Sequence, residues 1–96
     1  MTRLIITDIR KSSTIDDFDL LTAIILDAED HDEQCILTLA KKNCKGLLIL
    51  ESAIAEQAIP DIGVRRGDQF LRIRANSDHG LVVGEELRFG DSKNGQ

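Results

Sequence analysis

The stretch that decides the fold reads Gly63-Val64-Arg65-Arg66-Gly67-Asp68-Gln69-Phe70-Leu71-Arg72-Ile73-Arg74-Ala75. A Gly-Asp turn leads into alternating side chains, which predict a strand over 69–76 because successive side chains of a strand point to opposite faces. One face, with Leu71, Ile73 and Ala75, is apolar enough to join a core. The other face carries one aromatic ring and two guanidinium groups, those of Phe70, Arg72 and Arg74.

The segments on either side of this strand carry turn and helix signals. After it, residues 76–80 (Asn-Ser-Asp-His-Gly) have the composition of a turn and predict a hairpin. The returning strand spans 81–89, with Gly84 as a bulge or a bend. Before it, residues 52–59 predict a helix, because Ser52 can cap its start and Pro60 stops it.

The first half of the chain is rich in apolar runs. Residues 3–9 predict a short first strand. In 18–28 the β-branched residues favour a buried strand, and the loop 43–46 (Asn-Cys-Lys-Gly) favours a hairpin that joins 35–42 to 47–50. Periodicity alone also permits helices over 15–28 and 33–44, and that alternative stays open.

The expected order is four strands, a helix and two strands. From 18 to 89 it resembles the OB-fold (oligonucleotide/oligosaccharide-binding) domains, in which a helix follows the third strand of a meander and Gly67-Asp68 would precede the next strand. The resemblance implies a mainly β fold, a small OB-like barrel of five to six strands with one short helix. It does not explain the strand at 3–9. The alternative is an α+β two-layer sandwich.

Length and composition indicate one soluble globular domain. The chain has 96 residues, of which 42% are hydrophobic and 30% charged. We expect a single domain over 1–96, with a core in about 3–89 and a flexible tail at 90–96. We see no signal peptide, no membrane span and no disulfide pattern, so we expect a cytoplasmic protein.

Charge is unevenly placed along the chain, whose formal net charge is −5. Residues 1–34 hold three basic and nine acidic side chains, a balance of −6, whereas 35–96 hold nine basic and eight acidic, a balance of +1. This distribution argues against general affinity for nucleic acid, which depends on Lys and Arg. A local basic face is still possible.

The face with Phe70, Arg72 and Arg74 is the first candidate site. The ring could stack on a base and the two arginines could hold phosphates. OB-fold domains commonly bind single-stranded nucleic acid on such a strand surface, and the resemblance implies the same function here. Further basic residues could extend the patch, namely Arg65, Arg66, Arg88, Lys41 and Lys42. In the structural alternative, Phe70 packs under the helix and the arginines pair with Glu85 and Glu86.

The acidic segment 27–33 is the second candidate site. It lacks the glycine and the regular spacing of a calcium-binding loop, so it does not predict a metal site. It can instead attract a basic protein, as a subunit of an assembly or as a small acidic inhibitor that mimics nucleic acid. The carboxylates of this alternative interface are Asp27, Glu29, Asp30, Asp32 and Glu33.

Neither metal nor catalytic motifs are present in the sequence. His31, Cys35, Cys44 and His79 follow no zinc spacing, and no nucleophile elbow, phosphate-binding loop or His-Glu-x-x-His occurs. We therefore expect a binding module with no cofactor and no enzymatic activity. An edge strand left by an incomplete barrel, expected at 3–9, could pair between chains and give a homodimer.

Overall fold

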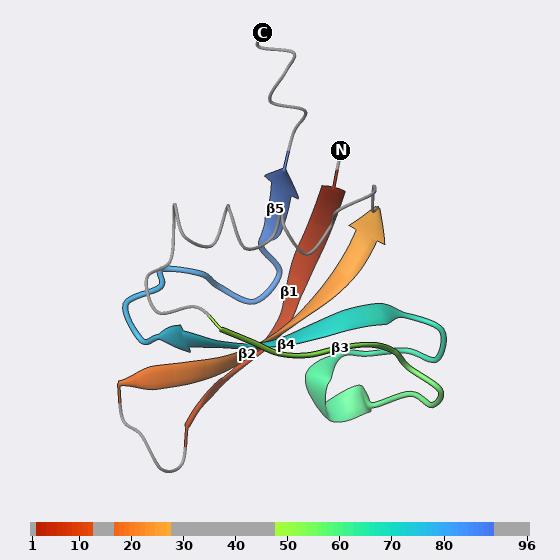
Figure 1. Cartoon of the computed structure of the whole chain (residues 1–96), viewed down its shortest axis with the longest axis horizontal. Coiled ribbons are helices and arrows are strands. Elements are labelled where there is room, and N and C mark those ends of the chain that lie inside the picture. The colour runs from red at the N-terminus through yellow and green to blue at the C-terminus, as the bar shows by residue number, and fades with distance from the viewer. Residues whose placement is uncertain (1, 13–16, 28–47, 90–96) are drawn as a thin grey trace, which may run out of the picture.

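The computed structural model describes residues 2–12, 17–27 and 48–89, and these form one antiparallel sheet (Figure 1). The sheet has five strands in the order β3-β4-β2-β1-β5. Between β3 and β4 lies one short 3-10 turn, η1. The bounds are β1 (Thr2–Lys11), β2 (Phe18–Asp27), β3 (Leu48–Ile54), η1 (Pro60–Ile62), β4 (Gln69–Asn76) and β5 (Glu86–Phe89).

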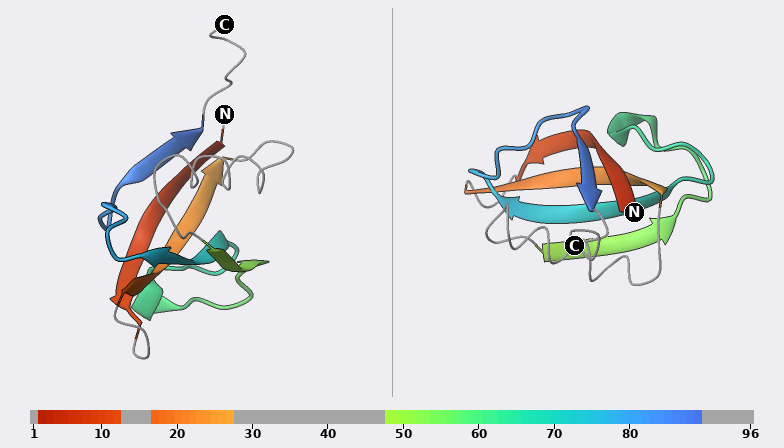
Figure 2. Two further views of the ribbon diagram at one scale, coloured as in Figure 1. Left: turned by 60° about the vertical axis from the view of Figure 1, so that its left-hand side comes forward. Right: turned by 90° about the horizontal axis from the view of Figure 1, so that it is seen from above.

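This architecture confirms the mainly β prediction. The sheet is twisted and curved but does not close into a barrel (Figure 2). The strands predicted at 3–9, 18–28 and 69–76 are present as β1, β2 and β4. Because 18–27 is a strand, the alternative helix over 15–28 is wrong. The segments predicted at 33–44 lie outside the described residues.

The register between β2 and β4 sorts the side chains of the sheet onto two faces. Ile73 lies opposite Leu21 and Leu71 opposite Ala23, and these residues belong to what we call the inner face. All four are between 0% and 4% exposed, and Leu4 and Ile6 of β1 join them in one cluster. Leu81 and Leu87, which follow β4 in the chain, pack against that cluster. The inner face is thus the main core, and it is entirely aliphatic, as the scarcity of aromatic residues suggests.

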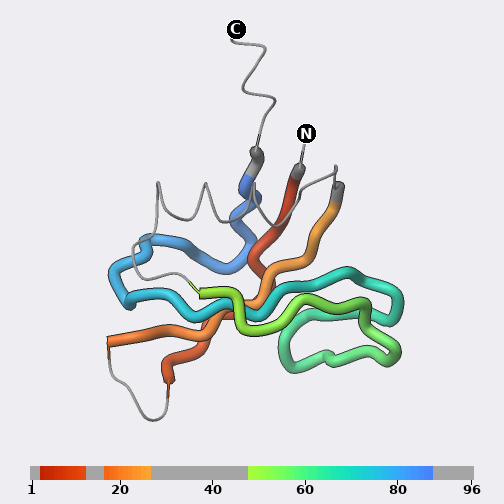
Figure 3. Tube along the Cα trace, in the orientation of Figure 1, coloured from red at the N-terminus to blue at the C-terminus, as the bar shows by residue number. Residues whose placement is uncertain are grey.

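Among the described residues, only those at one end of the sheet cover the opposite, outer face. The loop that joins β3 to β4 lies at one end of the sheet (Figure 3). Its residues Ala55, Ile62 and Val64 pack with Ile24 of β2 and Phe70 of β4 in a second cluster. We call residues 55–64 the covering loop, and the rest of the outer face its open half.

Two contacts with β1 hold the covering loop in place. The Thr7 hydroxyl donates to the Ile62 carbonyl oxygen over 2.7 Å, and the Arg10 Nη2 donates to the Asp61 carbonyl oxygen over 2.8 Å. Gly63 ends η1 with a φ of 73°, and a Cβ there would lie 2.9 Å from the Thr7 Cβ. The close approach and the left-handed conformation both favour glycine at this position.

The predicted helix over 52–59 is wrong. Ser52, Ala53 and Ile54 instead continue β3 and pair with β4, and Pro60 begins the 3-10 turn rather than ending a helix. Pairing of this segment with β4, in which Ala53 lies opposite Phe70, overrides the capping signal of Ser52.

Two further expectations need correction at the other side of the sheet. The returning strand predicted over 81–89 is shorter, because residues 81–85 form a turn in which Gly84 has a φ of 92°. Gly84 and Glu85 each form one backbone hydrogen bond with Ile6, and the regular pairing with β1 begins at Glu86. As a result, β1 is paired on both sides and is not an edge strand. The edges of the described sheet are β3 and β5. Within the described ranges, no helix is long and apolar enough to cross a membrane.

We predict that Leu71→Ala lowers the free energy of unfolding by about 2–5 kcal/mol, because Leu71 is 0% exposed and a cavity would remain. The matched control is Leu26→Ala, the same change at a side chain that is 46% exposed. It should cost less than about 1 kcal/mol. Urea denaturation of both variants measures the difference. Equal losses would contradict the assignment of the inner face as the core.

Candidate nucleic-acid interface

The three predicted residues of β4 share the outer face but not the same environment. Phe70 is only 4% exposed, because the covering loop packs over its ring. The prediction that Phe70 stacks on a base is therefore wrong for this structure. Arg72 and Arg74 lie further along β4, beyond the covering loop, and are half-buried. The candidate site is thus limited to the open half of the outer face.

Within the described ranges, neither of these arginines is paired with a carboxylate. In the described part of the chain, no Asp or Glu oxygen lies within 4.0 Å of the guanidinium of Arg72 or Arg74. The expected pairing with Glu85 and Glu86 is wrong. Glu86 instead forms an ion pair with Arg3 over 2.9 Å, and Glu85 Oε1 accepts the backbone N–H of Val82. Arg74 Nε is, moreover, buried, and no described residue accepts a hydrogen bond from it.

An aromatic ring is nevertheless present on the open half. The guanidinium carbon of Arg74 lies 4.6 Å from the centre of the Phe18 ring, at the start of β2. At this distance the positive charge of Arg74 forms a cation–π contact with the ring. Phe18 was not among the predicted site residues, because its position beside Arg74 depends on the pairing of β2 with β4.

Arg10 is a second residue that the sequence did not single out. In the pairing of β1 with β2, Arg10 lies opposite Leu20, and in the pairing of β2 with β4, Leu20 lies opposite Arg74. Arg10 and Arg74 are therefore aligned across the strands on the outer face. Arg10 Nε donates to Asp8 Oδ2 over 2.8 Å. The charge of Arg10 is therefore partly balanced, unlike the charges of Arg72 and Arg74.

The other predicted basic residues lie away from this pair. Arg65 and Arg66 lie in the turn before β4, where Arg65 faces Asp68 and its side chain is 89% exposed. Arg88 is in β5, which is three strands from β4, or roughly 14 Å at ordinary strand spacing. Lys41 and Lys42 lie outside the described residues. The structure thus groups Arg72 and Arg74 but not the wider patch.

The predicted acidic interface is described only at its first residue. Asp27 ends β2, opposite Arg3 of β1. Glu29, Asp30, Asp32 and Glu33 lie outside the described residues, and so do His31, Cys35 and Cys44. In the ranges that the structure does describe, no group of three His, Cys, Asp or Glu side chains could hold a metal ion.

His79 has both ring nitrogens occupied. Nε2 lies 2.8 Å from Asp19 Oδ2, and Nδ1 accepts the backbone N–H of Leu81 over 2.8 Å. The second bond leaves the proton on Nε2, which donates it to the carboxylate. Both side chains are nearly buried, with 5% of His79 and 11% of Asp19 exposed. This geometry ties the turn after β4 to β2 and leaves no nitrogen to activate a nucleophile.

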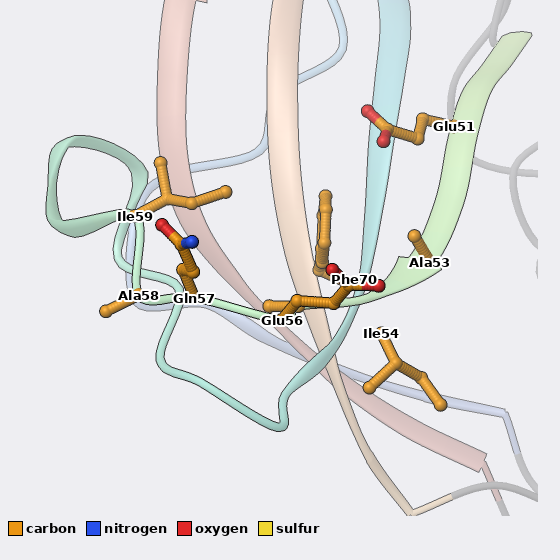
Figure 4. Close-up of a pocket in the computed structure, with 9 residues that line it drawn as sticks. Glu51, Ala53, Ile54, Glu56, Gln57, Ala58, Ile59 and Phe70 are labelled. Carbon is orange, nitrogen blue, oxygen red and sulfur yellow. The ribbon is translucent and has the colours of Figure 1, made fainter.

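A hollow lies between β3 and the covering loop (Figure 4). Its volume is about 340 Å³, and Phe70 contributes to its apolar lining. Carboxylates of Glu51 and Glu56 line the same hollow, so it is poorly suited to a phosphate. The lining residues are Glu51, Ala53, Ile54, Ala55, Glu56, Gln57, Ala58, Ile59 and Phe70.

We predict that Arg74→Met leaves the free energy of unfolding unchanged or raises it by about 1 kcal/mol. The change removes a buried, unpaired donor, while the thioether keeps contact with the Phe18 ring. The control is Arg3→Met, which removes an ion pair and should lower stability slightly, by less than about 1 kcal/mol. Thermal and urea unfolding test both. A loss above about 1 kcal/mol for Arg74→Met would make Arg74 a structural residue.

Comparison with known proteins does not place the chain in a family. No family model, no curated protein and no solved structure matches it. The resemblance to OB-fold domains therefore stays a prediction from the sequence. What the protein does must be inferred from the placement of its own residues.

Proposed function

We propose that this protein is a binding module for single-stranded nucleic acid, which lies across the open half of the outer face. One observation carries the proposal: Arg72 and Arg74 project from one face of β4 and neither has a carboxylate partner in the described part of the chain. Unpaired guanidinium groups are costly to keep half-buried unless they serve a ligand. A phosphate group is the acceptor that suits their planar fork.

Phe18 and Arg74 together offer a stacking surface for a base. The Arg74 guanidinium carbon lies 4.6 Å from the centre of the Phe18 ring, and we propose that a nucleobase stacks on this pair. Bases stack on arginine planes as they do on aromatic rings, and such stacking does not depend on sequence. Phe18 takes the place of the buried Phe70 in this interpretation.

The acidic character of the chain limits the affinity that we expect. The net charge is −5. Two carboxylates also lie on the same face as the arginines, because Asp8 is opposite Thr22 and Glu51 is opposite Arg72. Attraction to nucleic acid is therefore local and not general. We expect binding that is weak at moderate salt and that depends on a small number of phosphate contacts.

A protein partner is the second candidate function. The observation in its favour is the edge strand β3, on which Leu48, Leu50 and Ile54 are between 48% and 67% exposed. Exposed apolar side chains on an unpaired edge are typical of contacts with another chain. The acidic segment 27–33 is compatible with a basic partner but lies outside the described residues. Catalysis forms no part of either candidate.

The test is a titration of fluorescent single-stranded DNA and RNA oligomers at several salt concentrations. We expect the double variant Arg72→Gln/Arg74→Gln to weaken binding at least tenfold. It should also reduce the slope of log K against log salt by roughly 1.4, because each phosphate contact on a single strand contributes about 0.7.

The matched control is Arg65→Gln/Arg66→Gln, which removes the same charge from an exposed turn. This variant should keep most of the affinity, and circular dichroism must show both variants folded. Equal losses in the two variants would mean that net charge alone drives binding. Absence of binding by the wild-type protein at low salt would rule out the nucleic-acid proposal and favour a protein partner.

A further inference from the structure

β3 lies at one edge of the sheet that the described residues form. In the described part of the sheet it pairs with β4 alone. Leu50 is 52% and Ile54 67% exposed. Natural edge strands are usually protected by several charges, a proline or a covering segment. The only charge on β3 is that of Glu51, and no proline lies within the strand.

The direction of the backbone groups identifies the residues available for pairing. Ala55, just after β3, donates its N–H to the Asp68 carbonyl oxygen and accepts the N–H of Gly67, both over 2.8 Å. Its polar groups therefore point toward the chain that leads into β4. Since this direction alternates along an antiparallel pair, the backbone groups of Ser52 and Ile54 point away from β4, toward the open edge.

We propose that β3 pairs with β3 of a second copy of this chain, antiparallel, around a two-fold axis at Ser52. This register joins the two Ser52 residues through backbone groups that point away from β4, and it brings the 67% exposed Ile54 into the interface. It also places Glu51 opposite Ala53 of the second copy. An axis at Glu51 would instead place two carboxylates opposite each other, which is unfavourable.

The pairing joins two five-stranded sheets into one continuous sheet. Residues that lie opposite each other in a strand pair share a face, so the outer faces of the two copies become continuous. The two β4 strands are then three strand spacings apart, or roughly 14 Å. If nucleic acid binds as proposed above, both arginine pairs can hold one strand, but the dimer itself does not rest on that function.

Sedimentation equilibrium of the full chain tests the dimer. The pairing is short, so we expect a mass that rises with concentration from 10.6 kDa toward twice that value in the micromolar to millimolar range. Ser52→Pro removes an N–H that faces the open edge and not β4, and Ile54→Lys adds charge at a 67% exposed position. Both variants should sediment as single chains at the highest concentration used. Val83→Lys, a similar change at an exposed side chain outside β3, should sediment as the wild type does.

Disulfide trapping tests the register directly. In a background with Cys35→Ser and Cys44→Ser, Ser52→Cys should form a cross-linked dimer under mild oxidation, because paired Cα atoms about 5.5 Å apart suit a disulfide. Glu56→Cys, which lies beyond β3, should not cross-link to its equivalent. The proposal is overturned if the wild type keeps a mass of 10.6 kDa at millimolar concentration, or if Val83→Lys abolishes association as Ile54→Lys does. Equal trapping of Cys at 52 and 56 would overturn the register.

Discussion

The pairing of β2 with β4 is the constraint on which the rest of this structure depends. It aligns two alternating strands so that Leu21, Ala23, Leu71 and Ile73 fill one face, and it places Arg72 and Arg74 on the other. A shift of one residue would exchange the two faces and bury both guanidinium groups. The apolar pattern that builds the core therefore also fixes where the arginines lie. The core residues and the candidate site residues of β4 therefore lie on opposite faces of the same strand.

The covering loop limits the part of the outer face that is accessible to a ligand. It packs on Phe70 and Ile24, and its contacts with Thr7 and Arg10 hold it across β1. This end of the face becomes a second, smaller core. Beyond the loop, no described residue forms such a cover over Arg72 and Arg74. Both are half-buried and have no acid partner in the described part of the chain. A protein selected for stability alone would gain from replacing such side chains, and this is why we propose that they bind a ligand.

The sequence predicted β4 with its correct bounds and the location of β2, because alternating and β-branched residues are local signals. Prediction from the sequence failed where contacts between distant segments determine the structure. Residues 52–54 have a helix-like start signal, but they become a strand because β4 offers them a backbone partner. Phe70 and Phe18 both occupy the outer face, and only the path of the covering loop makes one a core residue and the other a neighbour of Arg74. Likewise, the sequence predicts β1 as an edge strand, whereas in the structure β5 pairs with it.

The central claim is that nucleic acid meets the open half of the outer face. The most direct measurement is a two-dimensional ¹H–¹⁵N spectrum of the labelled protein, recorded at low salt while a short single-stranded oligomer is added. The account predicts that the backbone signals of Phe18, Leu20, Arg72 and Arg74 shift, and that those of Ile62 and Val64 in the covering loop do not. Shifts centred on the covering loop, or no shifts at millimolar oligomer, would contradict it.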